Sequence, residues 1–218
     1  MHLKEYTFLN IMKSHIENLI NKELKHVKCD IHLDIKGKFL ELPIVVDNKH
    51  VVEGVLCHRY KGNGFLVAPS PQVGCPVKCD FCDMCDLPYK GSLKPEAILE
   101  QIALILNRAK RFGYDVDEKK LKISFVKGGE ALLNKNFPKA LELIAQELPV
   151  MMKVSTTFPD VNRAHDVFKR VEKFAVEYEN TTQIQISLIS TNEKYRREMT
   201  KMPLISFDEL RKYAIHWK

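Results

Sequence analysis

Four cysteines fall within eleven residues of this 218-residue sequence, and three of them have a spacing suited to an iron–sulfur cluster. Cys75, Cys79 and Cys82 follow one another at intervals of four and three residues, on a loop after a short apolar run. Three thiolates on one loop can occupy three corners of a [4Fe–4S] cluster and leave the fourth iron without a protein ligand. Such an iron can bind the amino and carboxylate groups of S-adenosylmethionine (SAM) and pass an electron to its sulfonium, which yields a 5′-deoxyadenosyl radical. The spacing therefore predicts a [4Fe–4S] cluster and SAM as cofactors.

A zinc site is the alternative for the same cysteines. Cys79, Cys82 and Cys85 form two overlapping Cys-x-x-Cys pairs, and together with Cys75 they could make a closed tetrahedral zinc site. Structural zinc usually draws its two pairs from separate hairpins, which favours the iron–sulfur interpretation. In that interpretation Cys85 is a bystander thiol near the site.

A second candidate segment is Gly128-Gly129-Glu130, directly after a predicted strand. Glycines let a backbone approach a ligand closely, and the carboxylate of Glu130 could accept a hydrogen bond from the SAM ammonium. Ser155 and Ser187 lie at the ends of the next two predicted strands, where their hydroxyls suit the carboxylate or ribose of SAM. The alternatives are a tight turn closed by a surface acid for the first segment, and helix capping for the two serines.

The elements that carry these residues alternate regularly. Strands are predicted at residues 65–68, 121–126, 150–155 and 183–189, and helices at 97–111, 137–148, 161–178 and from 206 to the end. One helix between successive strands predicts βαβ units and a parallel sheet. The fold class is therefore α/β, a partial (β/α) barrel with about four βα units. The fourth strand would present an open apolar edge, so we expect either a fragment of a longer chain or another element that covers this edge.

A small α+β segment precedes these units. Apolar residues between 3 and 24 recur at helical spacing, and two strand-like runs at 39–46 and 50–58 are separated by the turn residues Asp47-Asn48. We therefore expect two domains, a lead-in over residues 1–60 and the SAM-binding core over residues 61–218.

Composition narrows the classes of function only slightly. Hydrophobic residues make up 45% and charged residues 28% of the chain, as in ordinary globular proteins. No apolar run is long enough to span a membrane and no apolar signal core follows Met1, so we expect a cytoplasmic protein without a membrane partner. The net charge of +6 is compatible with an anionic partner such as RNA.

The cysteine motif resembles the signature of the radical-SAM superfamily, Cys-x-x-x-Cys-x-x-Cys with an aromatic residue before the third cysteine. The resemblance implies that Phe81 lies near the adenine of SAM. Gly128-Gly129-Glu130 is similar to the superfamily's Gly-Gly-Glu-Pro segment, with Ala131 in place of proline. By the same resemblance, an external one-electron donor of flavodoxin or ferredoxin type is expected.

A closer resemblance is to the RlmN/Cfr-type ribosomal-RNA adenine methyltransferases, from about Val51 to the end. It rests on four segments in the same order: Ser70-Pro71-Gln72-Val73-Gly74-Cys75, Gly129-Glu130-Ala131-Leu132-Leu133-Asn134, Val154-Ser155-Thr156-Thr157, and Ile186-Ser187-Leu188 followed by Asn192-Glu193-Lys194-Tyr195-Arg196. The resemblance implies a partial (β/α)6 barrel and an adenine in structured RNA as the ancestral substrate.

The chain departs from that family where methyl transfer takes place. The family uses one cysteine to carry the methyl group and a second to resolve the RNA adduct. Ala68 occupies the position of the second cysteine, the first would lie beyond Lys218, and Ile189 replaces a histidine. Three functions are therefore open: a radical-SAM enzyme that cleaves SAM and acts on another substrate, a truncated RNA methyltransferase-like protein without methyl transfer, and a zinc-binding RNA-associated module.

Overall fold

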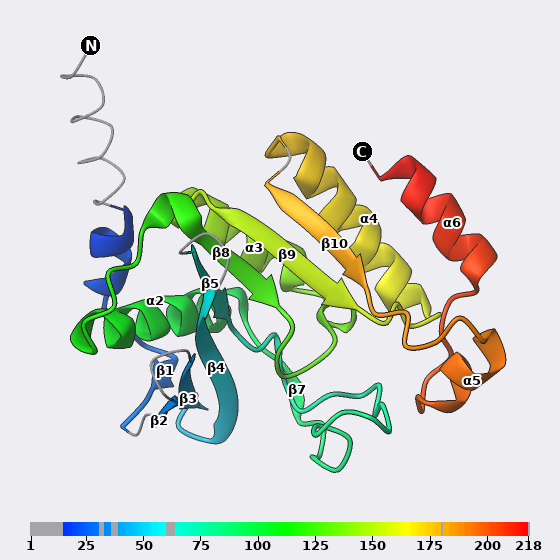
Figure 1. Cartoon of the computed structure of the whole chain (residues 1–218), viewed down its shortest axis with the longest axis horizontal. Coiled ribbons are helices and arrows are strands. Elements are labelled where there is room, and N and C mark those ends of the chain that lie inside the picture. Colours follow the sequence, from blue (N-terminus) through cyan, green and yellow to red (C-terminus); the bar gives the residue numbers. More distant parts are fainter. Residues whose placement is uncertain (1–14, 31–32, 36–38, 60–63, 180, 218) are drawn as a thin grey trace.

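A single mixed sheet forms the centre of the molecule (Figure 1). The computed structural model describes residues 15–30, 33–35, 39–59, 64–179 and 181–217. Within this part of the chain the sheet has eight strands in the order β1-β3-β4-β5-β8-β9-β10, with β2 paired to β3. The predicted helix over residues 3–24 lies largely outside the described residues; its described part is helical at 15–20 and gives way to a turn before Leu24.

The parallel half of the sheet confirms the predicted α/β class and its four βα units. Its strands are β5 (Gly64–Ala68), β8 (Leu121–Phe125), β9 (Met151–Thr156) and β10 (Thr182–Ile186), each parallel to the next. The helices that follow them are α2 (Pro95–Arg111), α3 (Phe137–Glu147), α4 (Asn162–Glu177), and then α5 (Glu193–Glu198) and α6 (Phe207–His216). Short 3-10 helices lie at Glu118–Lys120 (η1) and Ala131–Leu133 (η2).

The antiparallel half extends the same sheet. It contains β1 (Val27–Lys28), β2 (Leu33–Ile35), β3 (Phe39–Val46) and β4 (His50–Arg59), and the second half of β4, from Val55 to Arg59, pairs with β5. A separate two-stranded sheet joins β6 (Gln72–Val73) to β7 (Gly91–Ser92) at the base of the cysteine loop. Because β4 and β5 are hydrogen-bonded neighbours, the lead-in and the core share one sheet. The division into two domains at residue 60 stays a prediction.

The hairpin between β3 and β4 has a tight two-residue turn. Asp47 and Asn48 both have positive φ, 48° and 54°, and the amide of Lys49 donates to the Val46 carbonyl at 3.0 Å. This is the twist-matched turn that Asx residues favour in hairpins. The Asp47 carboxylate also lies 2.8 Å from His26 Nδ1, which ties the turn to β1. The first residues of β4 are therefore held on a rigid hairpin tip.

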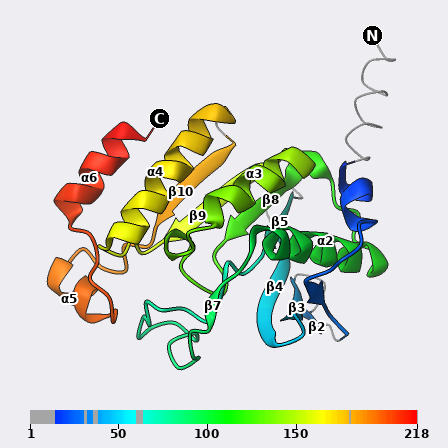
Figure 2. The ribbon, with the colours of Figure 1, turned by 180° about the vertical axis from the view of Figure 1, so that it is seen from behind.

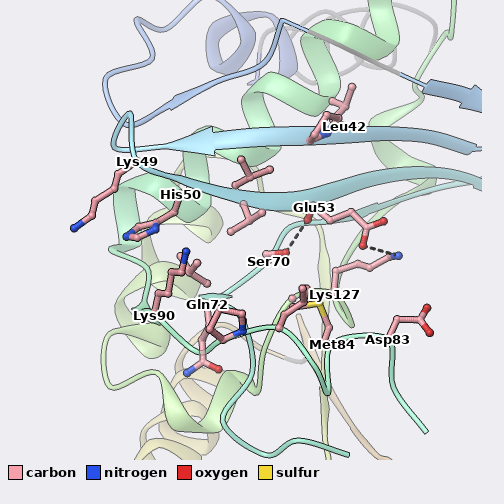
Figure 3. Close-up of a pocket in the computed structure, with 18 of the residues that line it drawn as sticks. Leu42, Lys49, His50, Glu53, Ser70, Gln72, Asp83, Met84, Lys90 and Lys127 are labelled. Atoms are coloured by element: carbon pink, nitrogen blue, oxygen red, sulfur yellow. Dashed lines mark hydrogen bonds and ion pairs between the residues drawn. The ribbon is translucent and has the colours of Figure 1, made fainter.

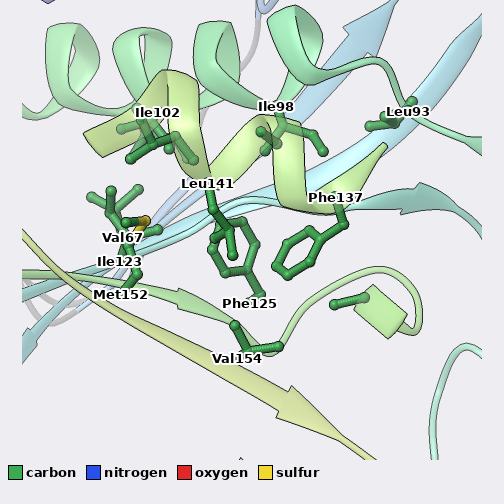
Figure 4. Close-up of a cluster of buried hydrophobic side chains, with 14 of the residues drawn as sticks. Val67, Leu93, Ile98, Ile102, Ile123, Phe125, Phe137, Leu141, Met152 and Val154 are labelled. Carbon is green, nitrogen blue, oxygen red and sulfur yellow. The ribbon is translucent and has the colours of Figure 1, made fainter. Parts of the chain in front are cut away.

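Helices α2, α3 and α4 cover one face of the sheet (Figure 2). Val67, Ile123 and Met152 lie in register on three parallel strands, and in Figure 4 they face Ile102 of α2. Next to this row the rings of Phe125 and Phe137 meet edge to face at 4.7 Å. Burying each such side chain contributes about 1.5–3 kcal/mol to folding, so this layer fixes the strand ends that carry the candidate site.

The ends of the elements differ from the predictions by a few residues. Pro95 is the first residue of α2 and Gly113, with φ of 79°, follows its last turn, as the sequence indicated. The strand predicted to reach residue 189 ends at Ile186; the Ser187 amide still donates to the Thr156 carbonyl, and the chain then turns at Ile189, whose φ is 66°. The structure thus turns the chain away from the sheet directly after the candidate serine.

The last helix begins as the capping-box spacing predicted. The side chain of Ser206 accepts from the Glu209 amide, and the Glu209 side chain accepts from the Ser206 amide. Helix α6 is then fixed to α4 through His165, which lies 2.8 Å from the Tyr213 hydroxyl and 3.0 Å from Asp160. None of the described helices is both long and apolar enough to cross a membrane.

Candidate functional site

A cavity of about 340 Å³ lies at the carboxyl ends of β8, β9 and β10. Parallel strands present their carboxyl ends at one edge, which is where α/β folds form their sites. Nine lining residues are those the sequence singled out: Cys75, Cys79, Cys82, Phe81, Gly128, Gly129, Glu130, Ser155 and Ser187. The structure therefore brings together in one cavity residues that lie more than a hundred positions apart. Their roles toward a ligand stay predictions.

The cysteine loop is anchored at its centre. The Asp80 amide donates to the Met199 carbonyl and the Lys201 amide donates to the Val77 carbonyl, both at 2.9 Å, and Lys201 Nζ lies 3.0 Å from the Asp80 carboxylate. These contacts hold the loop against the segment after α5. Cys85 is not among the residues that line the cavity. A three-thiol site therefore fits the loop better than a four-cysteine zinc site.

The surroundings of Cys75 and Cys79 disfavour their thiolate forms. The pKa of Cys79 is raised to about 12, chiefly by burial and in smaller part by the neighbouring Cys75 and Cys82, because adjacent thiolates repel each other. Burial also raises the pKa of Cys75. Thiolates bound to a metal centre are stabilised by its positive charge, which reverses this effect.

The donor set suits a [4Fe–4S] cluster in number and type, with three cysteines at one end of a cavity. Among the described residues, no three His, Cys, Asp or Glu side chains converge closely enough to hold a metal ion. The thiols of Cys75, Cys79 and Cys82 would therefore have to turn toward one another to hold a cluster.

The two glycines permit a close approach of two chain segments. Gly128 and Gly129 have φ of 38° and 126°, and a β-carbon on Gly129 would lie 2.6 Å from the Cβ of Gln72. One on Gly128 would lie 2.1 Å from the Ser70 hydroxyl oxygen. The glycines are thus needed for packing against the strand that leads into the cysteine loop, as well as for any approach to a ligand.

Glu130 is buried and holds the floor of the cavity together. Its carboxylate accepts from the Leu132 amide at 3.2 Å, from the Thr157 amide at 3.0 Å and from the Thr157 hydroxyl at 3.1 Å. Burial raises the pKa of Glu130, and these hydrogen bonds act in the opposite direction. The Thr156 side chain also lowers this pKa through a hydrogen bond, so the roughly four acceptor positions of the carboxylate are largely engaged by protein donors. The surface-acid alternative for Glu130 is wrong, because only 4% of this residue is exposed.

The serines differ in their partners. The Ser155 hydroxyl is buried and has no hydrogen-bond partner among the described residues, although Ser155 lines the cavity. Helix α4 begins at Asn162 without a side-chain cap, so Ser155 does not serve as a helix cap. A buried hydroxyl without a partner is costly to leave unpaired, which makes Ser155 the lining residue best prepared to receive a polar ligand group.

Sequence reasoning did not assign roles to Gln72, Thr157 and Arg196. Gln72 accepts from the Glu130 amide at 2.8 Å, and the buried Arg196 guanidinium donates to the Thr157 carbonyl at 3.1 Å. Both pairs join segments far apart in the sequence. The only signal for them was their presence in the segments that resemble the RNA methyltransferases.

Sequence comparison supports that resemblance. No family model matches the chain. It is 31% identical to a probable dual-specificity RNA methyltransferase RlmN of Koribacter versatilis over 142 residues, 63% of this chain and 37% of the relative. It is 26% identical to the RlmN protein of Flavobacterium psychrophilum, also named a probable dual-specificity RNA methyltransferase, over 211 residues, 93% of this chain and 55% of the relative. The chain is a relative of the RlmN-type radical-SAM RNA methyltransferases. It spans between about a third and about half of the length of these curated relatives.

A solved structure agrees with this relationship at the level of the fold. The crystal structure of a radical SAM methyltransferase from Sphaerobacter thermophilus superposes with a TM-score of 0.65 at 19% identity, over 92% of this chain and 54% of that one. This RlmN relative therefore shares its fold with about half of that solved structure.

Ala68, the residue where the RlmN resemblance implies a cysteine, is buried at the end of β5. Its methyl side chain offers no nucleophile or acid. The described chain therefore provides no resolving thiol at this position.

Proposed function

We propose that the chain binds a [4Fe–4S] cluster through Cys75, Cys79 and Cys82 and cleaves SAM reductively beside it. When bound, such a cluster supplies the electron that splits the sulfonium of SAM into methionine and a 5′-deoxyadenosyl radical. That electron comes from an external donor of flavodoxin or ferredoxin type. A cytoplasmic location, where thiols stay reduced, is part of the proposal.

The chain's own residues bind and orient SAM. In the proposal the Glu130 carboxylate attracts the SAM ammonium, and the hydroxyls of Ser155 and Ser187 pair with the carboxylate or ribose of SAM. The ring of Phe81, which is 53% exposed on the cavity wall, covers the adenine. Gly128 and Gly129 leave room for the methionine moiety.

One observation carries the proposal: the residues that the sequence predicted for cluster and SAM binding line a single cavity at the carboxyl ends of three parallel strands. A structural zinc site uses only its four ligands, so it does not account for the buried Glu130 carboxylate and the unpaired Ser155 hydroxyl in the same cavity. The zinc-binding module is therefore the weaker alternative.

The substrate side of the proposal follows the relatives, whose printed names describe RNA methyltransferases. We propose that the radical acts on a nucleotide, in RNA or derived from it. Because Ala68 replaces the expected thiol, we propose that this chain does not by itself complete the family's methyl transfer.

Cluster assembly tests the proposal with a matched pair of variants. After anaerobic reconstitution with iron and sulfide, the native chain and Cys85→Ala should bind about four irons, whereas Cys79→Ala should not. Addition of SAM to the reduced protein should change the electron paramagnetic resonance signal of the cluster. Retention of zinc in all three proteins, with no cluster formed, would contradict the proposal.

A further inference from the structure

A second and larger cavity adjoins the candidate SAM site. It has a volume of about 830 Å³ and lies between the hairpin β3–β4 and the cysteine loop (Figure 3). The two cavities share five wall residues: Glu53, Asp83, Met84, Lys127 and Gly128. Its size falls in the range of small-molecule sites, so it can receive a substrate whose reactive part lies beside the SAM cavity.

The charges on this cavity are segregated. Lys49, His50 and Lys90 gather at one end in Figure 3, while Asp83 and Glu53 lie toward the other. The strand register places the remaining acid, Glu41, away from the cationic end as well. His50 pairs with Val46 of β3, and Glu41 lies five residues from Val46 along that strand, about 16 Å away. One end is therefore cationic and the end nearer the cysteine loop carries the acids.

The charged groups at this end differ from Lys127 in having no ion-pair partner among the described residues. The ammonium of Lys127 is neutralised by Glu53 at 2.9 Å. In contrast, Lys49 and Lys90 have no ion-pair partner among the described residues. His50 Nδ1 is buried and likewise has no hydrogen-bond partner in the described part of the chain. Two unpaired ammonium groups and an unpaired imidazole nitrogen at one end of the cavity suit an anion with several oxygens.

The backbone holds these groups in position before any ligand binds. Lys49 and His50 directly follow the tight turn at Asp47-Asn48, which is tied to β1 through His26. Lys90 precedes β7, and its amide donates to the Val73 carbonyl at 2.8 Å. The two segments come from opposite walls, so an anion between them would bridge the hairpin and the cysteine loop.

We propose that Lys49, His50 and Lys90 form a phosphate subsite that holds a nucleotide phosphate while the base extends past Met84 toward the SAM cavity. Leu42, Val52 and Val73 line the same cavity and offer apolar surface to the base or sugar. This inference rests on the proposed function for the identity of the substrate, and it assigns the residues that bind its phosphate. The phosphate belongs either to a free nucleotide or to the backbone of a polynucleotide.

Binding measurements on the full chain test the subsite. The probes are adenosine, adenosine 5′-monophosphate and a short single-stranded adenosine-containing RNA. Each is titrated by calorimetry into the native chain and into two double variants, first Lys49→Gln/Lys90→Gln and then the control Lys169→Gln/Lys212→Gln. The last variant removes the same charge from exposed lysines on α4 and α6 that line neither cavity. At least one phosphorylated probe should bind the native chain about tenfold or more tightly than adenosine, and the first variant alone should lose this preference.

The arms of the experiment separate the two phosphate sources. Tight binding of the monophosphate indicates a free nucleotide, and tight binding of RNA alone indicates a polynucleotide. For RNA, the slope of log affinity against log salt should fall by about 0.7 for each ammonium removed. Both lysines of the first variant are exposed, so its thermal unfolding should match that of the native chain.

Two results would overturn the subsite: equal binding of adenosine and both phosphorylated probes by the native chain, or equal losses in the two double variants. Phosphate-dependent binding without formation of 5′-deoxyadenosine by the native chain would instead contradict the proposed function and leave the subsite standing. The two failures are thus distinguishable.

Discussion

Single residues in the candidate site combine structural and ligand-binding roles to different degrees. Glu130 is occupied by three protein donors, whereas the Ser155 hydroxyl has none in the described chain. Substitutions at these two positions should therefore have different consequences for folding and for SAM binding.

Ser155→Ala should weaken SAM binding without weakening the fold. Removing a buried, unpaired hydroxyl leaves the unfolding free energy unchanged or raises it by up to about 1 kcal/mol. The lost hydrogen bond to SAM should reduce affinity about fivefold in cluster-loaded protein, measured by equilibrium dialysis. A drop in stability together with unchanged SAM affinity would show that the hydroxyl has a purely structural role.

Glu130 should make stability depend on pH. Its pKa in the folded protein is raised by burial above the usual value of 4.5. The folded state therefore holds a proton that the unfolded state has already released, so the unfolding free energy should fall as pH rises from 4.5 through the folded pKa. Urea unfolding at several pH values should show that the unfolding free energy falls more steeply with pH for the native chain than for Glu130→Gln. Parallel pH profiles would contradict the assignment, since the other titrating groups are common to both proteins.

At the scale of elements, the cavity depends on how closely the loop after β8 packs against the segment between β5 and β6. Gly129 lies at this contact, where any side chain would collide with Gln72. The Gln72 carboxamide also orients the Glu130 backbone through their 2.8 Å hydrogen bond. The geometry of the loop after β8 therefore depends on its contact with Gln72, and substitution of Gly129 should disturb this contact.

Gly129→Ala should destabilise the protein by more than Gly113→Ala. Both glycines have positive φ, 126° and 79°, so both variants carry backbone strain of about 1–3 kcal/mol. A β-carbon at Gly113 meets no atom within 4 Å, whereas one at Gly129 overlaps Gln72. We expect an additional loss of about 1–3 kcal/mol and impaired SAM binding only for Gly129→Ala. Equal effects in urea unfolding would contradict the packing account.

The sequence predicted the elements that have a strong period and missed those that do not. Strand 39–46 and helix α2 with Pro95 and Gly113 followed from alternation and end signals. Strands β6 and β7, two residues each, and the six-residue α5 are too short to show a period. The site was predictable where it depends on residue type and spacing. The long-range partners of Glu130 were not, because no local pattern pairs Gln72 or Thr157 with it.

At the scale of the whole molecule, the sheet and its core are continuous. Buried side chains from Leu19 to Leu210 form a single cluster that includes both the antiparallel and the parallel strands. The described chain thus has one core, although the sequence predicted a division into residues 1–60 and 61–218. Unfolding experiments decide between these two descriptions.

A single cooperative transition is expected. Trp217, the only tryptophan, packs 5.7 Å from Phe168 and reports on α6, whereas circular dichroism reports on all elements. Urea curves from tryptophan fluorescence and far-ultraviolet circular dichroism should coincide. An early circular-dichroism transition that leaves fluorescence unchanged would support two domains instead.

The central claim concerns radical chemistry, and 5′-deoxyadenosine is its direct product. The measurement is mass spectrometry of 5′-deoxyadenosine after anaerobic reconstitution and reduction with SAM present, for the native chain, Cys79→Ala and Cys85→Ala. The account predicts 5′-deoxyadenosine from the native chain and from Cys85→Ala, whose altered position lies outside the cavity, and none from Cys79→Ala. A cluster-loaded native chain that forms no 5′-deoxyadenosine, or equal amounts from all three proteins, would contradict it.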